Sequence, residues 1–231
     1  MMPSLNMCGF LYSGADLGGF GSNATEDLLL RWLAFGVFTP LMRNHSCDGT
    51  RLQEFFRFSH IERFRSIINV RYRLIPYIYS EYMKAVLTDD MLFKPLAFEY
   101  TKDEIASSIE DELIFGNEIL LAPVYTQNVK GRLVYLPEDM MLLRFCGDGS
   151  IETKQYQKGT YYISVPLDEV VLFIRSGKCI PIASPAETTS EIDYSSIVMY
   201  GYPDSTYELY NDDGLSKDYE NPDNYISLSL L

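Results

Sequence analysis

The sequence has few basic residues and no long uninterrupted apolar run. It contains 19 Lys and Arg against 32 Asp and Glu, and the net charge of −13 would repel polyphosphate backbones and anionic lipid surfaces. Charged residues interrupt the strongest apolar stretches, such as residues 168–182, well before a length that could cross a bilayer. We therefore expect no nucleic acid and no membrane among its partners.

Cysteine and histidine are also scarce. The two histidines, His45 and His60, have no metal-ligand companion at helical spacing, so we expect no metal and no cofactor. No CxxC pair occurs, and no charged-then-apolar leader opens the sequence. This pattern favours reduced thiols in a cytoplasmic protein. The four cysteines lie far apart, at Cys8, Cys47, Cys146 and Cys179.

Apolar and aromatic residues are plentiful. At 231 residues and 47% hydrophobic composition, the chain can bury a substantial core in one or two domains. The 18 tyrosines and 13 phenylalanines suit such a core, and they also suit surfaces that stack on the flat apolar faces of sugars. Core packing is the default interpretation, and no internal repeat is evident.

The first third of the sequence has the pattern of a strand, a glycine-rich turn, a helix and a second strand. Residues 8–14 predict a buried strand, and Thr25 followed by two acids predicts a helix N-terminus. A second short apolar run follows at 37–42, where Pro40 argues against a regular central strand. Ligands gather at the carboxyl ends of strands in such β/α units.

The residue pattern of the remaining sequence changes from helical to β-rich. Residues 60–87 have helical apolar spacing, with Pro76 expected to kink the helix, and short β-rich runs follow from about residue 92. A Pro/Ser/Thr-rich link covers residues 181–196. We predict three parts: 1–90 with β/α units, 91–183 as a proximal β-sandwich, and 184–231 as the start of a distal β-sandwich that stops mid-pattern.

Several segments together resemble one known family. The stretch "GADLGGFGSNATEDLLLRWLAFGVFTPLMRNHS" looks like the late-barrel signature of the glycoside hydrolase family 31 α-glucosidases. Further segments follow in the order of that family, so the resemblance covers nearly the entire chain. They are "RYRLIPYIYSEYMKA", "KPLAFEY", "FGNEILLAPV", "VYLPED", "PLDEVVLFIRSGKCIPI" and "LYNDDGLSKDYE".

The resemblance implies a fold class of α/β plus all-β. It predicts the last two β/α units of a (β/α)8 TIM barrel in residues 1–90, followed by C-terminal β-sandwich domains. It also implies a retaining hydrolase of α-linked glucosides in carbohydrate metabolism. Two strands cannot close such a barrel, so we expect the missing N-terminal barrel segment, or an oligomeric partner, to supply the others.

Retaining glycoside chemistry needs two carboxyl groups roughly 5–5.5 Å apart. The family carries them in motifs of the Trp-x-Asp-Met-Asn and Gly-Asp types, and neither motif occurs in residues 1–90. We expect both catalytic aspartates to lie before Met1. The resemblance therefore predicts no catalytic residue in this chain, and a chain that is inactive alone.

The resemblance places four substrate-binding residues at the ends of the two barrel strands. Asp16 ends the seventh strand, and Arg43 and His45 end the eighth. His45 matches the histidine that bonds sugar hydroxyls, and Phe20 matches an aromatic that lines the same pocket. We expect Asp16 to fix Arg43 by charge-assisted bonds and to shape the pocket, without acting as the nucleophile.

Other interpretations of these residues remain open. Asp16 could be a turn or cap residue, His45 could be structural, and Arg43 is favoured as an ion-pair partner over a direct sugar ligand. Asp48 or Glu54 could pair with Asp16 to complete a hydrolase, although their segment is loop-like.

Two function classes follow. The favoured one is the C-terminal portion of a retaining α-glucosidase that binds an α-linked glucoside or oligosaccharide. The alternative is a non-catalytic carbohydrate-binding or complementing assembly module.

Residues 212–214, Asp-Asp-Gly, lack the regular acid spacing of a calcium loop and predict a β-turn with solvated acids.

Overall fold

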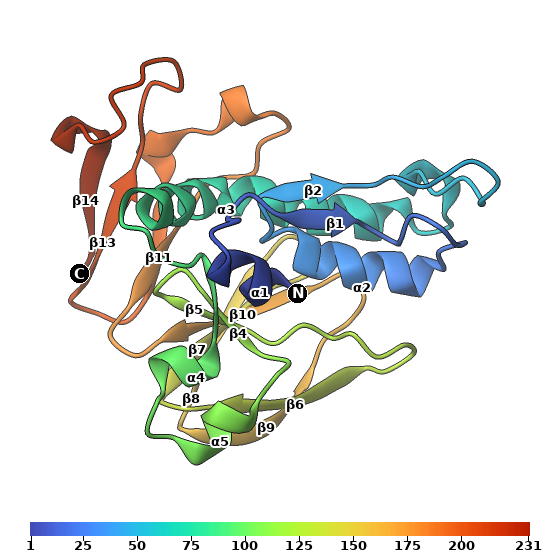
Figure 1. The fold of residues 1–231 in the computed structure, drawn as a ribbon, viewed down its shortest axis with the longest axis horizontal. Helices are drawn as coiled ribbons and strands as arrows, with labels where there is room; N and C mark the ends of the chain where they lie inside the picture. The colour runs from blue at the N-terminus through green and yellow to red at the C-terminus, as the bar shows by residue number, and fades with distance from the viewer.

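The computed structural model describes all 231 residues (Figure 1). Its helices are α1 (Met2–Met7), α2 (Glu26–Gly36), α3 (Ile61–Leu87), α4 (Leu96–Glu99) and α5 (Glu104–Ser108). Single 3₁₀ turns occur at Phe55–Arg57, Thr189–Glu191, Tyr194–Ser196 and Pro222–Asn224. The strands of the first half are β1 (Gly14–Asp16), β2 (Leu41–Arg43), β3 (Phe93–Pro95), β4 (Leu113–Phe115) and β5 (Ile119–Leu121). The later strands are β6 (Gly131–Leu136), β7 (Met140–Phe145), β8 (Ile151–Tyr156), β9 (Gly159–Ser164), β10 (Val170–Arg175), β11 (Cys179–Ile182), β12 (Val198–Gly201), β13 (Ser205–Tyr210) and β14 (Tyr225–Leu230).

The β1–α2–β2 unit forms the part of the fold that carries the predicted site. β1 and β2 pair in parallel, with Asp16 opposite Arg43 at the end of the ladder. Thr25 caps α2 as predicted, because its hydroxyl accepts a hydrogen bond from the Leu28 amide at 3.1 Å. Figure 1 shows the two strands lying side by side along α2. Only glycine fits at Gly14, where an added Cβ would lie 1.9 Å from the Leu41 carbonyl oxygen.

The first strand begins later than the sequence predicts. Residues 8–14 were expected to form it, but the ladder starts at Gly14 and a short helix, α1, occupies Met2–Met7. Phe10 and Tyr12 are both 65% exposed, and this apolar run pairs with no strand before Gly14, although Leu11 packs against the main apolar cluster. The second strand also begins late, at Leu41, directly after Pro40, which has no N–H to donate to a ladder.

The long helix α3 is confirmed over nearly its whole predicted length and continues through Pro76. Its buried face includes Phe64, Ile67, Leu74 and Tyr77, which pack in the main apolar cluster. α3 contacts α2 on one side and β11 and β13 on the other. It therefore joins the β1–α2–β2 unit to the last part of the chain.

The central β-rich region contains two sheets. The larger is antiparallel with the strand order β3-β4-β5-β10-β7-β8, and β6 pairs separately with β9. A second apolar cluster includes Leu120, Leu142 and Phe173 from the larger sheet and Val134 and Ile163 from the smaller one. Figure 1 shows β6, β9 and α5 at the bottom of the view and β13 and β14 at its left.

The β-rich runs in the sequence predicted β4, β5, β6, β9 and β10. They did not predict β3, β7 and β8, and the segments of β7 and β8 are rich in Met or charged residues. The expected proximal sandwich has one six-stranded sheet and one two-stranded sheet, so complete sandwiches stay a prediction. The last part of the chain has only the pairs β11–β12 and β13–β14.

The main apolar cluster is continuous across the predicted parts. It contains Met2 and Leu33, then Phe115 and Ile180, and finally Leu209. The predicted boundaries near 90 and 183 stay predictions. None of the helices combines the length and the apolar character needed to span a bilayer.

Candidate functional site

Asp16 and Arg43 form a direct ion pair at the carboxyl ends of β1 and β2. The Nε and Nη2 atoms of Arg43 lie 2.7 and 2.6 Å from the same oxygen, Oδ1 of Asp16. No protein group donates to the other oxygen, Oδ2. Arg43 is half exposed and Asp16 is largely covered. The carboxylate therefore fixes the guanidinium and still has an oxygen available to a hydroxyl donor.

Phe20 and His45 face each other on the loops that follow the two strands. Their ring centroids are 5.4 Å apart, with 34° between the planes. The loops are also joined through the backbone, because the Cys47 amide donates to the Phe20 carbonyl oxygen at 2.9 Å. Phe20 is 50% exposed, and His45 is exposed with no hydrogen bond from its ring nitrogens to the protein.

The structure thus brings the four predicted residues together as two contacting pairs on one edge. Their contact with a sugar stays a prediction. The larger cavities lie elsewhere, and one of them, about 550 Å³, lies between α1, β1, α2 and the segment 107–113. The four side chains form an open edge in this chain, and further polypeptide would be needed to enclose it.

Two arginines that were not predicted from the sequence anchor the β1–α2–β2 unit: Arg71 holds the turn before β2, and Arg31 ties α2 to the central β-rich region. Arg71 of α3 donates to the carbonyl oxygens of Val37, at 2.8 Å, and Pro40, at 3.2 Å, and so holds the turn before β2. Arg31 of α2 is only 8% exposed, and it donates to Val165, at 2.8 Å, and Val129, at 2.9 Å. The sequence feature that could have identified both arginines is a basic residue among apolar neighbours in a predicted helix.

The other acids that the sequence analysis considered have separate environments. Glu54 pairs with Arg57 at 2.8 Å, and Asp48 is exposed in a loop, so neither contacts Asp16. The turn at residues 212–214 was expected to carry solvated acids. Asp212 instead accepts a hydrogen bond from the Tyr79 hydroxyl at 2.9 Å, because α3 passes beside this turn.

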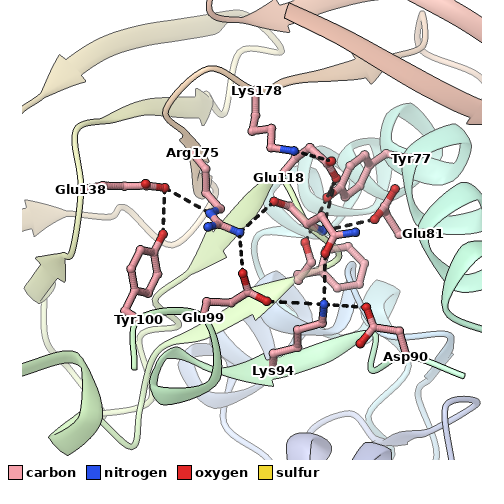
Figure 2. Close-up of polar contacts among 12 residues, drawn as sticks. Tyr77, Glu81, Asp90, Lys94, Glu99, Tyr100, Glu118, Glu138, Arg175 and Lys178 are labelled. Atoms are coloured by element: carbon pink, nitrogen blue, oxygen red, sulfur yellow. Dashed lines mark hydrogen bonds and ion pairs between the residues drawn. The ribbon is translucent and has the colours of Figure 1, made fainter. Parts of the chain in front are cut away.

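A second polar cluster, buried between α3 and the six-stranded sheet, was not predicted (Figure 2). Glu118 is 8% exposed and accepts from the Tyr77 hydroxyl at 3.1 Å. Glu81 accepts from the Tyr207 hydroxyl at 2.8 Å and pairs with Lys84 at 2.7 Å. Burial, together with the neighbouring charge of Glu81, raises the pKa of Glu118 to about 7.

A chain of ion pairs continues from this cluster toward the surface, as Figure 2 shows. Lys94 lies 3.6 Å from Glu99, which pairs with Arg175 at 3.1 Å. Arg175 also pairs with Glu138 at 3.1 Å, and the Tyr100 hydroxyl donates to that carboxylate at 2.8 Å. These contacts join β3, α4 and β10.

The buried acids do not form a second catalytic site. Both Glu81 and Glu118 accept hydrogen bonds from protein donors and are almost fully buried, so neither carboxylate is placed to reach a glycosidic bond. Their contacts tie α3 to the sheet and to β13. We assign this cluster to structure, and the open edge at β1 and β2 is the candidate binding site.

Two family models match the chain. Residues 1–81 match the "Glycosyl hydrolases family 31 TIM-barrel domain" and residues 89–180 match the "Glycosyl hydrolase family 31 C-terminal domain". Among curated proteins, the chain is 33% identical over 228 residues to Alpha-glucosidase 2 of Bacillus thermoamyloliquefaciens, covering 96% of this chain and 28% of that protein. It is 30% identical to intestinal sucrase-isomaltase of Oryctolagus cuniculus, covering 97% of this chain and 12% of that protein.

Solved structures give the same match. The glucosidase II alpha subunit bound to DNJ aligns with a TM-score of 0.82 and 25% identity, over 98% of this chain and 25% of that one. A GH31 dextranase of Flavobacterium johnsoniae, complexed with glucose, aligns with a TM-score of 0.79 and 25% identity, over 97% of this chain and 28% of that one. The chain thus spans between 12% and 28% of the length of these relatives.

Proposed function

Because this chain belongs to glycoside hydrolase family 31, we propose that its β1–β2 edge is one wall of the sugar site of a retaining α-glucosidase. The observation that carries the proposal is the pairing of Asp16 with Arg43 beside the pairing of Phe20 with His45. This edge lies where barrel enzymes bind their substrates, at the carboxyl ends of parallel strands.

The groups at this edge suit one glucose unit. Oδ2 of Asp16 can accept a hydrogen bond from a sugar hydroxyl, and the unpartnered ring nitrogens of His45 can donate and accept. The exposed ring of Phe20 offers an apolar surface to the C–H face of a pyranose. Arg43, already paired with Asp16, supplies a positive charge that holds the carboxylate in place.

Cleavage requires two carboxyl groups that this chain does not place at the edge. We propose that they come from the remaining strands of the barrel, on further polypeptide that pairs with the free edge of β1. This chain then holds the sugar and does not attack it, and it is inactive alone. One matched structure is titled as a heterodimeric complex of a catalytic subunit and the binding domain of a regulatory subunit, which supports a search for partner chains.

A carbohydrate-binding module is the second candidate. The observation that favours it is that both residue pairs form within this chain without added polypeptide. Titration calorimetry with maltose and isomaltose separates the two functions. Measurable binding by this chain alone favours the module, and heat that appears only after complementation favours the enzyme.

The cytoplasmic location is likewise a proposal, and it rests on four cysteines that form no disulfide. One relative is named "Lysosomal alpha-glucosidase", from Bos taurus, so the location of the family varies.

The direct test is complementation. This chain is mixed with the remaining barrel segment of the Bacillus relative, or fused to it, and hydrolysis of p-nitrophenyl α-glucoside is measured. We expect no turnover from either part alone and turnover from the completed barrel. Turnover by this chain alone would show that the catalytic carboxylates lie within residues 1–231.

A further inference from the structure

The side chain of Gln53 lies between the loop that follows β1 and the loop that follows β2. Its Nε2 donates to the carbonyl oxygens of Leu17, at 3.3 Å, and Gly19, at 3.4 Å, on the first loop. The same nitrogen donates to the carbonyl oxygen of His45, at 3.1 Å, on the second. One amide group therefore spans the backbones of both loops.

Gln53 is built into the fold, because only 3% of it is exposed. Its Oε1 is buried and has no hydrogen-bond partner, which costs free energy that an apolar residue would not. The Asn44 side chain donates to the Gln53 carbonyl oxygen at 2.8 Å and fixes the backbone that carries the amide. An apolar residue would pack equally well at this position. The three carbonyl oxygens that accept from the Gln53 amide explain why the residue is polar.

The loop after β1 has few other means of fixing its position. Gly18 and Gly19 have φ angles of +89° and +91°, so their backbone is flexible and offers no side chain for packing. Two backbone hydrogen bonds flank the amide: the Leu17 amide donates to Arg43 at 2.7 Å, and the Cys47 amide donates to Phe20 at 2.9 Å. Gln53 is the buried side-chain link between them, and a second, exposed link joins the Asn23 side chain to the Arg51 amide.

We propose that Gln53 is a positioning residue that holds Phe20 and His45 at their stacking distance and thereby sets the width of the sugar site. The role in setting the width of the sugar site rests on the proposed function. The role in holding the two loops together does not depend on it. Gln53 acts through the backbone of the two loops and touches no substrate. An uncharged donor is required here, because a carboxylate would face three carbonyl oxygens with no proton to donate.

The test compares Gln53→Met with the wild-type chain. Methionine keeps the length of the side chain and removes the donor. The nuclear Overhauser effect between the Phe20 and His45 rings reports their contact, and His45 is identified easily because the chain has only two histidines. We expect the variant to lose this signal and the Cys47 amide to exchange its hydrogen at least tenfold faster.

Gln155→Met is the matched control, because Gln155 is exposed on β8, away from the edge. Unchanged amide signals from β7 and β10 establish that each variant is folded. If Gln53→Met misfolds, Gln53→Glu is measured instead, and acidification should partly restore the ring contact by protonating the carboxylate. A ring contact that survives in Gln53→Met would overturn the proposal.

A kinetic measurement separates this inference from the proposed function. In the completed enzyme, Gln53→Met should raise KM for p-nitrophenyl α-glucoside at least fivefold, with a smaller change in kcat. Loss of the ring contact with unchanged kinetics would support Gln53 as the residue that sets the loops and reject Phe20 and His45 as sugar ligands. Retention of the ring contact would reject the Gln53 proposal whatever the kinetics.

Discussion

Arg43 directs two of its nitrogens, Nε and Nη2, to a single oxygen of Asp16, at 2.7 and 2.6 Å. The usual bidentate pair uses both carboxylate oxygens and consumes the acceptor capacity of the acid. Here Oδ2 stays available while Oδ1 fixes the orientation of the group. The ion pair and the proposed sugar contact therefore use different atoms of one side chain.

Replacing Asp16 with Asn should affect activity more than stability. The pair is partly exposed, so the change should cost about 1 kcal/mol or less of the free energy of unfolding. In the completed enzyme we expect kcat/KM to fall at least tenfold, a loss of about 1.4 kcal/mol or more of transition-state stabilisation. Chemical denaturation and steady-state kinetics measure the two effects.

Asp48→Asn, in the exposed loop, is the control for that change, and it should alter neither quantity. If the proposed sugar site is right, His45→Ala should also lower kcat/KM at least tenfold, because it would remove the proposed hydrogen bonds to the sugar. Wild-type kinetics in both Asp16→Asn and His45→Ala would exclude this edge as the sugar site.

Replacing Arg31 with Met should destabilise the chain. The guanidinium is buried and donates to the carbonyl oxygens of Val129 and Val165, which would lose these partners. We expect a loss of about 2–4 kcal/mol in the free energy of unfolding. Urea denaturation measures it, and Arg65→Met, which removes only an exposed pair with Glu62, should cost less than about 1 kcal/mol.

The stability of the chain should increase as pH falls from 7.5 to 5. Burial raises the pKa of Glu118 from 4.5 to about 7, so between these values the folded chain holds a proton that the unfolded chain has lost. Protonation therefore favours folding, and the contribution to the free energy of unfolding is about 2–3 kcal/mol at most. It is fully present below pH 4.5 and is lost as pH rises through 7.

Acidification also reduces the negative charge of the whole chain, and Glu118→Gln separates the contribution of Glu118 from that general effect. Glutamine still accepts the hydrogen bond from Tyr77 but does not titrate, so the rise in melting temperature on acidification should shrink. Glu208→Gln, exposed on β13, should keep the wild-type slope. Equal slopes for all three proteins would show that Glu118 does not carry the pH dependence.

Gly116 and Gly214 form a matched pair that separates steric crowding from backbone strain. Both have positive φ, +63° and +66°. A Cβ at Gly116 would lie 2.5 Å from Oε2 of Glu81 and 2.7 Å from the Tyr77 hydroxyl, whereas Gly214 has no atom within 4 Å. Alanine should cost about 1 kcal/mol at Gly214 and about 1–3 kcal/mol more at Gly116, measured by denaturation. Equal costs would show that the buried acids move aside.

Local patterns in the sequence predicted the elements that local interactions determine. Thr25 and its two following acids identified the start of α2, and helical spacing identified α3. The strand expected at 8–14 shifted to Gly14–Asp16 because strand formation depends on a neighbouring chain, and only β2 is present beside it. An apolar run predicts the capacity to pair, not the partner.

The candidate site was predicted through resemblance, and its supports were not predicted. Asp16, Phe20, Arg43 and His45 follow one motif, so they could be named before the fold was known. Gln53 was missed because its partners are three backbone carbonyls, which leave no trace in the sequence. Arg31 and Glu118 were missed because their partners lie far away along the chain. A polar residue within an apolar run was the only available signal.

The continuous apolar cluster determines whether the chain can be shortened. Leu74 and Tyr77 on α3 are covered in part by Ile180 and Tyr207, which come from well beyond residue 90. A truncated product ending near that position would leave these side chains open to water and would aggregate instead of folding. Protease resistance should therefore vanish for the whole chain over one narrow temperature interval, with no surviving core fragment.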